Sequence, residues 1–246
     1  GFFKRLYQPD RMVVAAAGNV AHDHLVERVG PVFSTIAAGN GFAPRCVPAT
    51  GGGIQLKHRD LEQSHICLGM NGVSVADPRR FAASLINTIF GGNMSSRLFQ
   101  LIREQRGLAY SIYSFLTAFA DAGMLGVYTA VAPTDLDVCV NLIMEQIRRL
   151  KREPVSDSVL ADAKAFTNGN LLMAAESPDN QMVRLAQNEY CFGRAIPIAS
   201  VIDAIDAVTA NDLLGLANDL WSDGSAALTM LGPGVDRTDL SGILKL

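Results

Sequence analysis

The 246-residue sequence lacks the features that mark membrane, nucleic-acid-binding and disordered proteins. No apolar run approaches the roughly 20 residues that a helix needs to cross a bilayer. A formal net charge of -3 provides no cationic field for nucleic acid or anionic lipid. With 49% hydrophobic and 18% charged residues, the composition is typical of a globular protein with a substantial core. We therefore expect neither a nucleic-acid nor a membrane partner.

Paired cysteines are also lacking. The chain has four cysteines, far apart and without a C-x-x-C pair. This spacing is typical of reduced thiols rather than of a disulfide framework, and it favours a cytoplasmic location. The cysteines are Cys46, Cys67, Cys139 and Cys191.

Apolar periodicity and Gly/Pro punctuation predict an α+β fold, with a mostly antiparallel sheet and helices packed on one face. One expected helix has Thr134 as its N-cap and ends before Pro154. The expected strands are 12–17, 54–57, 65–70, 110–117, 124–131 and 226–231. The expected helices are 2–7, one beginning near His24, 78–90, 95–105, the helix after Thr134, 155–176, 178–192, 198–205 and 211–220.

The two ends of the chain resemble each other. Tyr7 precedes Gly18 by the same interval that Trp221 precedes Gly232, and an apolar stretch lies between in each case, "MVVAAAG" and "AALTMLG". Such self-similarity indicates an internal repeat. We therefore expect residues 1–36 to be the tail of one copy, 37–52 a Gly- and Pro-rich linker, and 53–246 a complete second copy.

Two stretches carry possible metal ligands, and neither completes a site. "HDHLVER" begins like the H-x-x-E-H motif of inverted zincins, but Arg28 stands where the second histidine is needed, and its permanent charge repels a metal ion. His65 and Cys67 share one face of a strand without a third ligand. We expect this chain to bind no metal.

Other catalytic patterns are missing from the sequence. "FGGNMSSRLF" has adjacent glycines but not the G-K-[ST] ending of a phosphate-binding loop, so we interpret it as a turn in which Asn93 or Ser95 caps the next helix. No Ser-His-Asp or Cys-His arrangement stands out among the four histidines.

Arg103 and Tyr110 are the strongest candidate site residues. On a helical wheel Arg103 lies on the flank of an apolar stripe, while Arg97 faces away from it. Gly107 permits a sharp turn into the strand that Tyr110 begins. Guanidinium and phenol can then meet at the end of the sheet and donate to a single oxygen. A surface arginine and an unrelated strand tyrosine are the alternative.

The stretch "FGGNMSSRLFQLIREQRGLAYSIYS" closely resembles the C-terminal-half signature of the pitrilysin family. These inverted-zincin metallopeptidases include mitochondrial processing peptidase, insulin-degrading enzyme and bacterial processing-peptidase-like proteins. The resemblance extends over essentially the whole chain, through "YQPDRMVVAAAGNVAHDHLVE" and "ESPDNQMVRLAQNEYCFG". Asn93 departs from the family, where a third glycine is common.

The resemblance implies a function. In the family a first domain holds zinc, and a second supplies an Arg and a Tyr, spaced as Arg103 and Tyr110 are, that contact the substrate. It implies that 53–246 is a C-terminal peptidase domain and 1–36 the tail of a zinc-binding N-terminal domain. The full-length protein is then a zinc metalloendopeptidase acting on peptides or unfolded proteins, and this chain alone is inactive.

A second function stays open at this point. Some members of the family have lost the zinc motif and serve as non-catalytic partner or assembly subunits of heteromeric peptidases. The expected partners are therefore a peptide substrate, the N-terminal domain of the same protein, or another chain in a homodimer or heterodimer.

Overall fold

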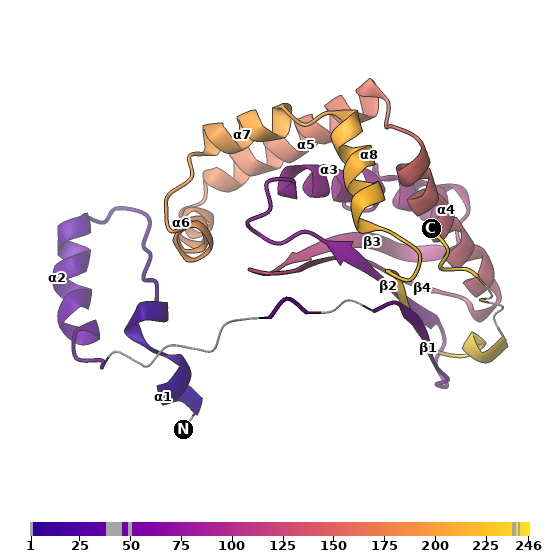
Figure 1. The fold of residues 1–246 in the computed structure, drawn as a ribbon, viewed down its shortest axis with the longest axis horizontal. Helices are drawn as coiled ribbons and strands as arrows, with labels where there is room; N and C mark the ends of the chain where they lie inside the picture. The colour runs from indigo at the N-terminus through magenta and orange to yellow at the C-terminus, as the bar shows by residue number, and fades with distance from the viewer. Residues whose placement is uncertain (1, 38–45, 49–50, 238–239, 241) are drawn as a thin grey trace. The chain divides into compact units, whose positions relative to one another are not determined.

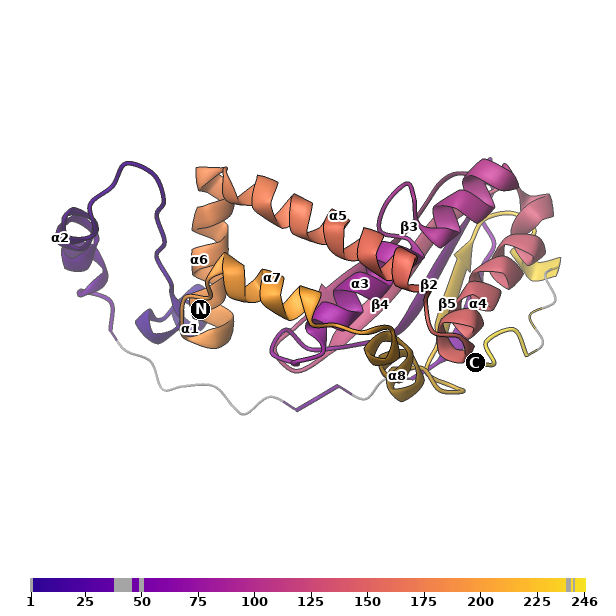
Figure 2. The same ribbon diagram turned by 90° about the horizontal axis from the view of Figure 1, so that it is seen from above.

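Figures 1 and 2 show the protein in a computed structural model. The chain divides into two compact units. Unit 1 comprises 1–46 and 169–201, and unit 2 comprises 47–168 and 202–246. The expected linker, 37–52, lies largely outside the described residues. The structure describes residues 2–37, 46–48, 51–237, 240 and 242–246.

Unit 2 is built on a five-stranded sheet in the order β1-β5-β2-β4-β3. β4 pairs antiparallel with β2 and β3, β2 also pairs antiparallel with β5, and β1 runs parallel to β5. The mostly antiparallel α+β fold is confirmed. The strands are β1 (Gly53–Lys57), β2 (Ser64–Gly72), β3 (Ala109–Ala118), β4 (Gly123–Val131) and β5 (Ala227–Leu231).

Helices cover one face of this sheet. In Figure 1, α3, α4 and α8 lie on the same side, where α8 contacts both other helices and β2. The opposite face carries no helix among the described residues of unit 2. The helices are α1 (Phe2–Leu6), α2 (His22–Phe33), α3 (Arg80–Phe90), α4 (Leu136–Arg152), α5 (Asp157–Ala175), α6 (Pro178–Phe192), α7 (Ile198–Asp206) and α8 (Ala210–Leu220), with a π-helix at Phe99–Gln105.

The core lies between the sheet and these helices. Along β2, Ile66, Leu68 and Met70 are buried while the residues between them are more exposed, as the two-residue period of a strand requires. α4 buries Val140, Ile143, Met144, Ile147 and Leu150, which recur at helical spacing. This pattern orients the sheet, because one face must meet the apolar stripes of the helices.

Trp221 joins α8 to the middle of the sheet. Its ring is 2% exposed, and Nε1 donates a hydrogen bond to the Asn71 carbonyl on β2 at 3.0 Å. After β5, Gly232 has φ +144°, a conformation that side chains disfavour. Gly18, its counterpart in the repeat, has φ +123°. The backbone thus preserves the glycine conformation at both ends of the chain.

The sequence predictions for 12–17 and for Thr134 are wrong. The stretch 12–17 is not a strand, because no described strand pairs with it and a strand exists only through its partners. Thr134 is not the N-cap of α4: Pro133 starts a 3-10 turn through Asp135, so that α4 begins at Leu136. The ends of α4 and α6 at Pro154 and Gly193 agree with prediction, since Glu153 is extended and Gly193 is left-handed.

A glycine pair on the uncovered face provides a matched test of packing. Gly126 on β4 pairs directly with Gly69 on β2. A Cβ at Gly126 would lie 2.3 Å from Cζ of Phe115, whereas one at Gly69 would meet the flexible Met124 Sδ at 3.3 Å. The Phe115 ring therefore lies across Gly126 and depends on its lack of a side chain.

We predict that Gly126→Ala lowers the free energy of unfolding by about 1–3 kcal/mol, because the Phe115 ring must move. Gly69→Ala, in the same row, should change it by less than about 0.5 kcal/mol. Urea unfolding measures both, and equal effects would contradict the packing described.

The stretch 12–17 should be the less protected part of the chain. Among the described residues its amides from Val13 to Ala17 donate no backbone hydrogen bond, while those of β4 are paired on both sides. Hydrogen exchange should therefore be much faster at 13–17 than at 127–131. Equal protection in a dilute monomer, measured by mass spectrometry, would show that this stretch has a backbone partner.

Candidate functional site

Arg103 lies in the π-helix Phe99–Gln105 rather than in the ordinary α-helix expected for 95–105. Leu98 and Ile102 are fully buried and anchor the segment. Gly107, with φ +62°, ends it: its N–H donates to the Arg103 carbonyl at 3.1 Å. π-Helices are rare and occur frequently at functional sites.

Tyr110 owes its position to an irregularity in β3. Ala109 pairs with Val131 and Ile112 with Thr129, so that two residues, Tyr110 and Ser111, lie opposite one. This extra residue is a β-bulge, a device that redirects side chains. Tyr110 is left 83% exposed at the end of the strand.

The structure brings Arg103 and Tyr110 together. The Arg103 guanidinium carbon lies 5.1 Å from the centre of the Tyr110 ring and 4.6 Å from that of Phe99. Such cation–π contacts hold a guanidinium in place. Glu104 Oε1 lies 3.5 Å from Arg103 Nε, and the Arg103 side chain is 34% exposed. A cation and a phenol are thus presented side by side, both able to donate to an acceptor from solution.

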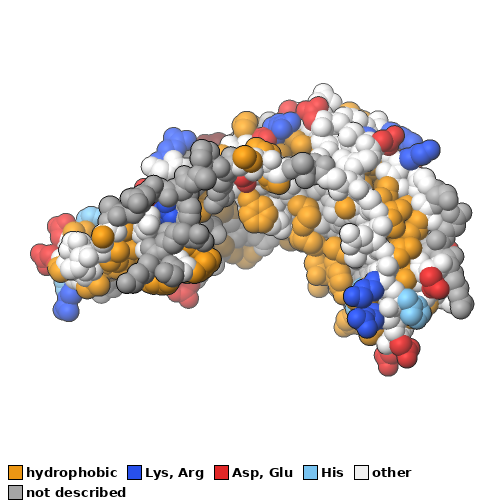
Figure 3. Space-filling view, turned by 60° about the horizontal axis from the view of Figure 1, so that its bottom comes forward, with side chains coloured by type: hydrophobic (Ala, Val, Ile, Leu, Met, Phe, Trp, Pro, Cys, Tyr) orange, Lys and Arg blue, Asp and Glu red, His pale blue; other side chains and the backbone are white. Residues whose placement is uncertain are grey.

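Neighbouring rings on β3 and β4 lie on the uncovered face of the sheet. Tyr113 lies 6.1 Å from Phe115 and 5.6 Å from Tyr128, between ring centres. The Tyr128 hydroxyl is 2.7 Å from His65 Nδ1. Figure 3 views the molecule with this side turned forward, and hydrophobic side chains reach the surface there. The face offers apolar contacts next to polar hydrogen-bonding groups.

The candidate metal ligands do not assemble. His24 lies on exposed α2, where its Nε2 accepts a hydrogen bond from Arg28 Nε at 3.4 Å. His65 is engaged by Tyr128, and Cys67 is exposed beside it. Within the described ranges no three His, Cys, Asp or Glu side chains come close enough to hold a metal ion. The residues that the structure describes therefore do not fit a zinc site.

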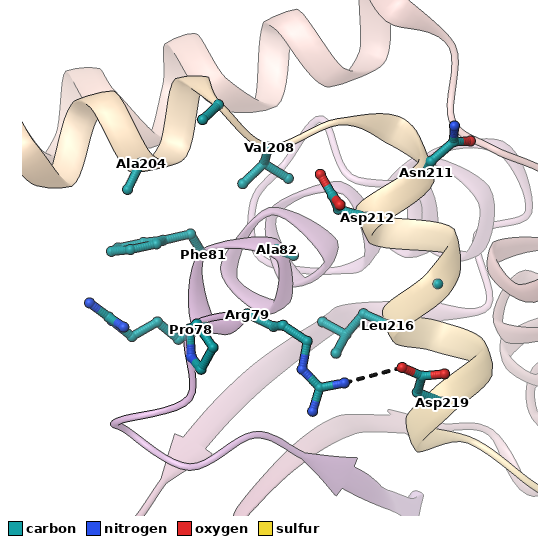
Figure 4. A pocket seen from close by; sticks show the side chains of 13 residues that line it. Pro78, Arg79, Phe81, Ala82, Ala204, Val208, Asn211, Asp212, Leu216 and Asp219 are labelled. Atoms are coloured by element: carbon teal, nitrogen blue, oxygen red, sulfur yellow. Dashed lines mark hydrogen bonds and ion pairs between the residues drawn. The ribbon is translucent and has the colours of Figure 1, made fainter.

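A hollow of about 600 Å³ lies between α3 and α8 (Figure 4). Arg79 bonds to Asp77 at 3.0 Å and to Asp219 at 3.2 Å, and its hydrogen bond holds the pKa of Asp77 below the usual value. Ala82, Val208 and Leu216 form apolar walls. These paired charges tie the two helices together and offer no free group for chemistry.

Sequence reasoning missed parts of this arrangement. The bulge had a signal, since Ala109 and Ile112 are both apolar but three residues apart, which breaks strand alternation. The bond between His65 and Tyr128 joins strands whose register cannot be read from the sequence. Arg97 does not face away from the core: part of its guanidinium is buried.

None of the helices we describe combines the length and hydrophobicity of a bilayer-spanning segment.

Comparison with known sequences identifies relatives. The family model described as the peptidase M16 inactive domain matches residues 1–166. A protein of Streptomyces coelicolor named as an uncharacterized zinc protease is 34% identical over 96% of this chain and 53% of its own length. A similarly named protein of Bacillus subtilis is 32% identical over 92% of this chain and 55% of its own length. The chain thus spans about half the length of these relatives.

Solved structures share the fold. A peptidase M16 inactive domain from Pseudomonas fluorescens has a TM-score of 0.77 and 20% identity, over 88% of this chain and 52% of that one. A chain of complex III2 from Candida albicans also has a TM-score of 0.77 and 20% identity, over 92% of this chain and 56% of its own. The resemblance stated from the motifs is confirmed by sequence and fold together: the chain belongs to the peptidase M16 family, as its inactive domain.

Proposed function

We propose that this chain is the C-terminal, substrate-binding half of a zinc metalloendopeptidase that cleaves peptides or unfolded proteins. The half of the protein that this chain does not include supplies the zinc ligands and is its principal partner. Two findings support the proposal: the relatives named zinc proteases are about twice as long as the matched region, and no zinc site assembles among the described residues of this chain.

The observation that carries the proposal is the contact between Arg103 and Tyr110. The guanidinium lies over the rings of Phe99 and Tyr110, and the Tyr110 hydroxyl group belongs to an exposed side chain. Both can donate hydrogen bonds to a substrate carbonyl oxygen. As that oxygen gains negative charge during hydrolysis the bonds strengthen, which lowers the barrier.

We also propose that the chain is divided as its sequence predicts. Residues 1–36 are the tail of the zinc-binding domain, 37–52 the linker and 53–246 the C-terminal peptidase domain. β5, the counterpart of 12–17 in the repeat, lies between two strands. We infer that 12–17 takes the equivalent inner place in the sheet of the other half. Reduced cysteines support a cytoplasmic location for the protein.

A non-catalytic partner subunit is the second candidate. The family model describes an inactive domain, and the fold is shared with a chain of complex III2. In that case Arg103 and Tyr110 serve another chain of a heterodimer. An H-x-x-E-H motif in the full-length protein favours the enzyme, and its absence favours the partner subunit.

We predict that Arg103→Ala and Tyr110→Phe, made in the zinc-loaded full-length protein, each lower kcat roughly a hundredfold, or about 3 kcal/mol. The double variant should lose less than the sum, because both groups serve one oxygen. The melting temperature should stay near that of the wild type, since Arg103 is partly exposed and Tyr110→Phe keeps the ring.

Arg106→Ala and Tyr190→Phe are matched controls, because both side chains are exposed. The Arg106 backbone N–H, which donates to the Arg103 carbonyl, is kept in Arg106→Ala. Steady-state kinetics on peptide substrates and thermal unfolding give the two readouts. If Arg103→Ala and Tyr110→Phe both retain wild-type kcat/KM, the pair has no part in catalysis and this proposal fails.

We further predict that the purified 246-residue chain holds no stoichiometric zinc and cleaves no peptide, whereas the full-length protein holds one zinc. Elemental analysis after dialysis measures this. One tightly bound zinc per chain, lost in His24→Ala or His65→Ala, would place the metal in this half instead.

A further inference from the structure

His65 presents an unused ring nitrogen on the uncovered face of the sheet. Its neighbours Ser64 and Ile66 are fully buried, and His65, between them, is half-buried and faces the other side of β2. Its Nδ1 lies 2.7 Å from the Tyr128 hydroxyl oxygen. Its Nε2 makes no hydrogen bond with the described residues and is not sealed from solvent. One nitrogen is therefore engaged by the protein, and the other is able to bind a ligand.

The bond to Tyr128 determines which nitrogen carries the imidazole proton. A phenol donates hydrogen bonds more readily than it accepts them, because its ring draws electron density from the oxygen. The Tyr128 hydroxyl has no other hydrogen-bond partner among the described residues, and the Tyr113 ring lies 5.6 Å from the Tyr128 ring, between centres. The hydroxyl therefore donates to Nδ1, and the proton of the neutral imidazole lies on Nε2. His65 thus offers an N–H donor to solution.

The strand register places His65 in line with Tyr110. His65 pairs directly with Ala130 on β4. On its other side Ala130 lies opposite the bulge that carries Tyr110, because its two neighbours on β4 pair with Ala109 and Ile112. Those two neighbours are fully buried, so Ala130 faces the uncovered side, as His65 does. Adjacent strands lie about 4.8 Å apart, which sets the backbones of His65 and Tyr110 about 10 Å apart with a small residue between them.

We propose that His65 is a further substrate-binding residue, whose Nε2–H donates to a backbone carbonyl oxygen of the peptide that Arg103 and Tyr110 contact. This inference rests on the proposed function and adds a second point of attachment to it. An extended peptide rises about 3.3 Å per residue, so it covers the distance from Tyr110 to His65 in about three residues. His65 therefore meets the peptide away from the bond that is cleaved. Tyr128 is a positioning residue, because it acts only through His65.

Steady-state kinetics separate this role from that of the Arg103 and Tyr110 pair. A contact away from the reacting carbonyl is equally strong in the ground state and the transition state, so its loss raises KM and leaves kcat. In the zinc-loaded full-length protein, His65→Leu should raise KM for an unstructured peptide of about ten residues roughly threefold to tenfold, the effect of one neutral hydrogen bond. Arg103→Ala should lower kcat instead, so the two ideas can fail separately.

Two conservative variants distinguish a binding role from a structural one. The amide nitrogen of His65→Gln reaches the position of Nε2, so this variant should keep KM within about twofold of the wild type. The shorter His65→Asn amide can accept from Tyr128 but does not reach that position, so its KM should rise as in His65→Leu. A purely structural bond predicts that Asn restores the melting temperature and that KM stays at the wild-type value throughout. His58→Leu is the control, because His58 is exposed and lies 3.8 Å from Asp236 Oδ1.

Equilibrium binding tests the contact without turnover. The probe is fluorescein-labelled β-casein, an unfolded protein, titrated with zinc-free full-length protein and followed by fluorescence anisotropy. The wild type should bind it, and His65→Leu should bind it roughly threefold to tenfold more weakly. Absence of casein binding by the wild type, or equal affinity in the wild type and His65→Leu, would overturn the inference. Weaker binding in His65→Leu together with wild-type kcat/KM in Arg103→Ala and Tyr110→Phe would refute only the catalytic role of that pair.

Discussion

The pairing of β4 with both β2 and β3 is the interaction on which the candidate site depends. It places Tyr128 between His65 and Tyr113, and it leaves room for the bulge that carries Tyr110. The same hydrogen bonds turn Ile66, Leu68 and Met70 toward the helices. Side chains for stability and for the proposed chemistry therefore alternate along the same strands, one face for each.

Most elements could be predicted because their periodicity is local. Helix α6 was expected at 178–192 and is found there, between a capping Ser177 and the left-handed Gly193. The strand predicted at 12–17 is wrong for the opposite reason. Its composition fits a strand, but a strand also needs a second segment to pair with. The prediction that Thr134 caps α4 is wrong because Pro133, one residue earlier, begins a tighter 3-10 turn. Local sequence determines which secondary structure a segment favours, and the segments that pack or pair with it determine which secondary structure it adopts.

Some features of the candidate site could likewise be predicted from the sequence, and others could not. The proximity of Arg103 and Tyr110 could be anticipated, since a helix end, a glycine and a strand start fix their separation along the chain. The partial burial of Arg97 could not be anticipated. A helical wheel does not show that residues of α5 line a cavity beside Arg97 or that Arg149 lies nearby. Residues within one supersecondary unit are predictable from sequence, and residues whose surroundings come from distant segments are not.

The inner position of β5 has a consequence for synthesis. β1 emerges first from the ribosome, yet the described structure attaches it to the sheet only through β5, which is the last strand made. Until residues 227–231 appear, β1 has no backbone partner and β2 presents one open edge. The sheet therefore stays incomplete while residues 132–226, most of them helical, are translated.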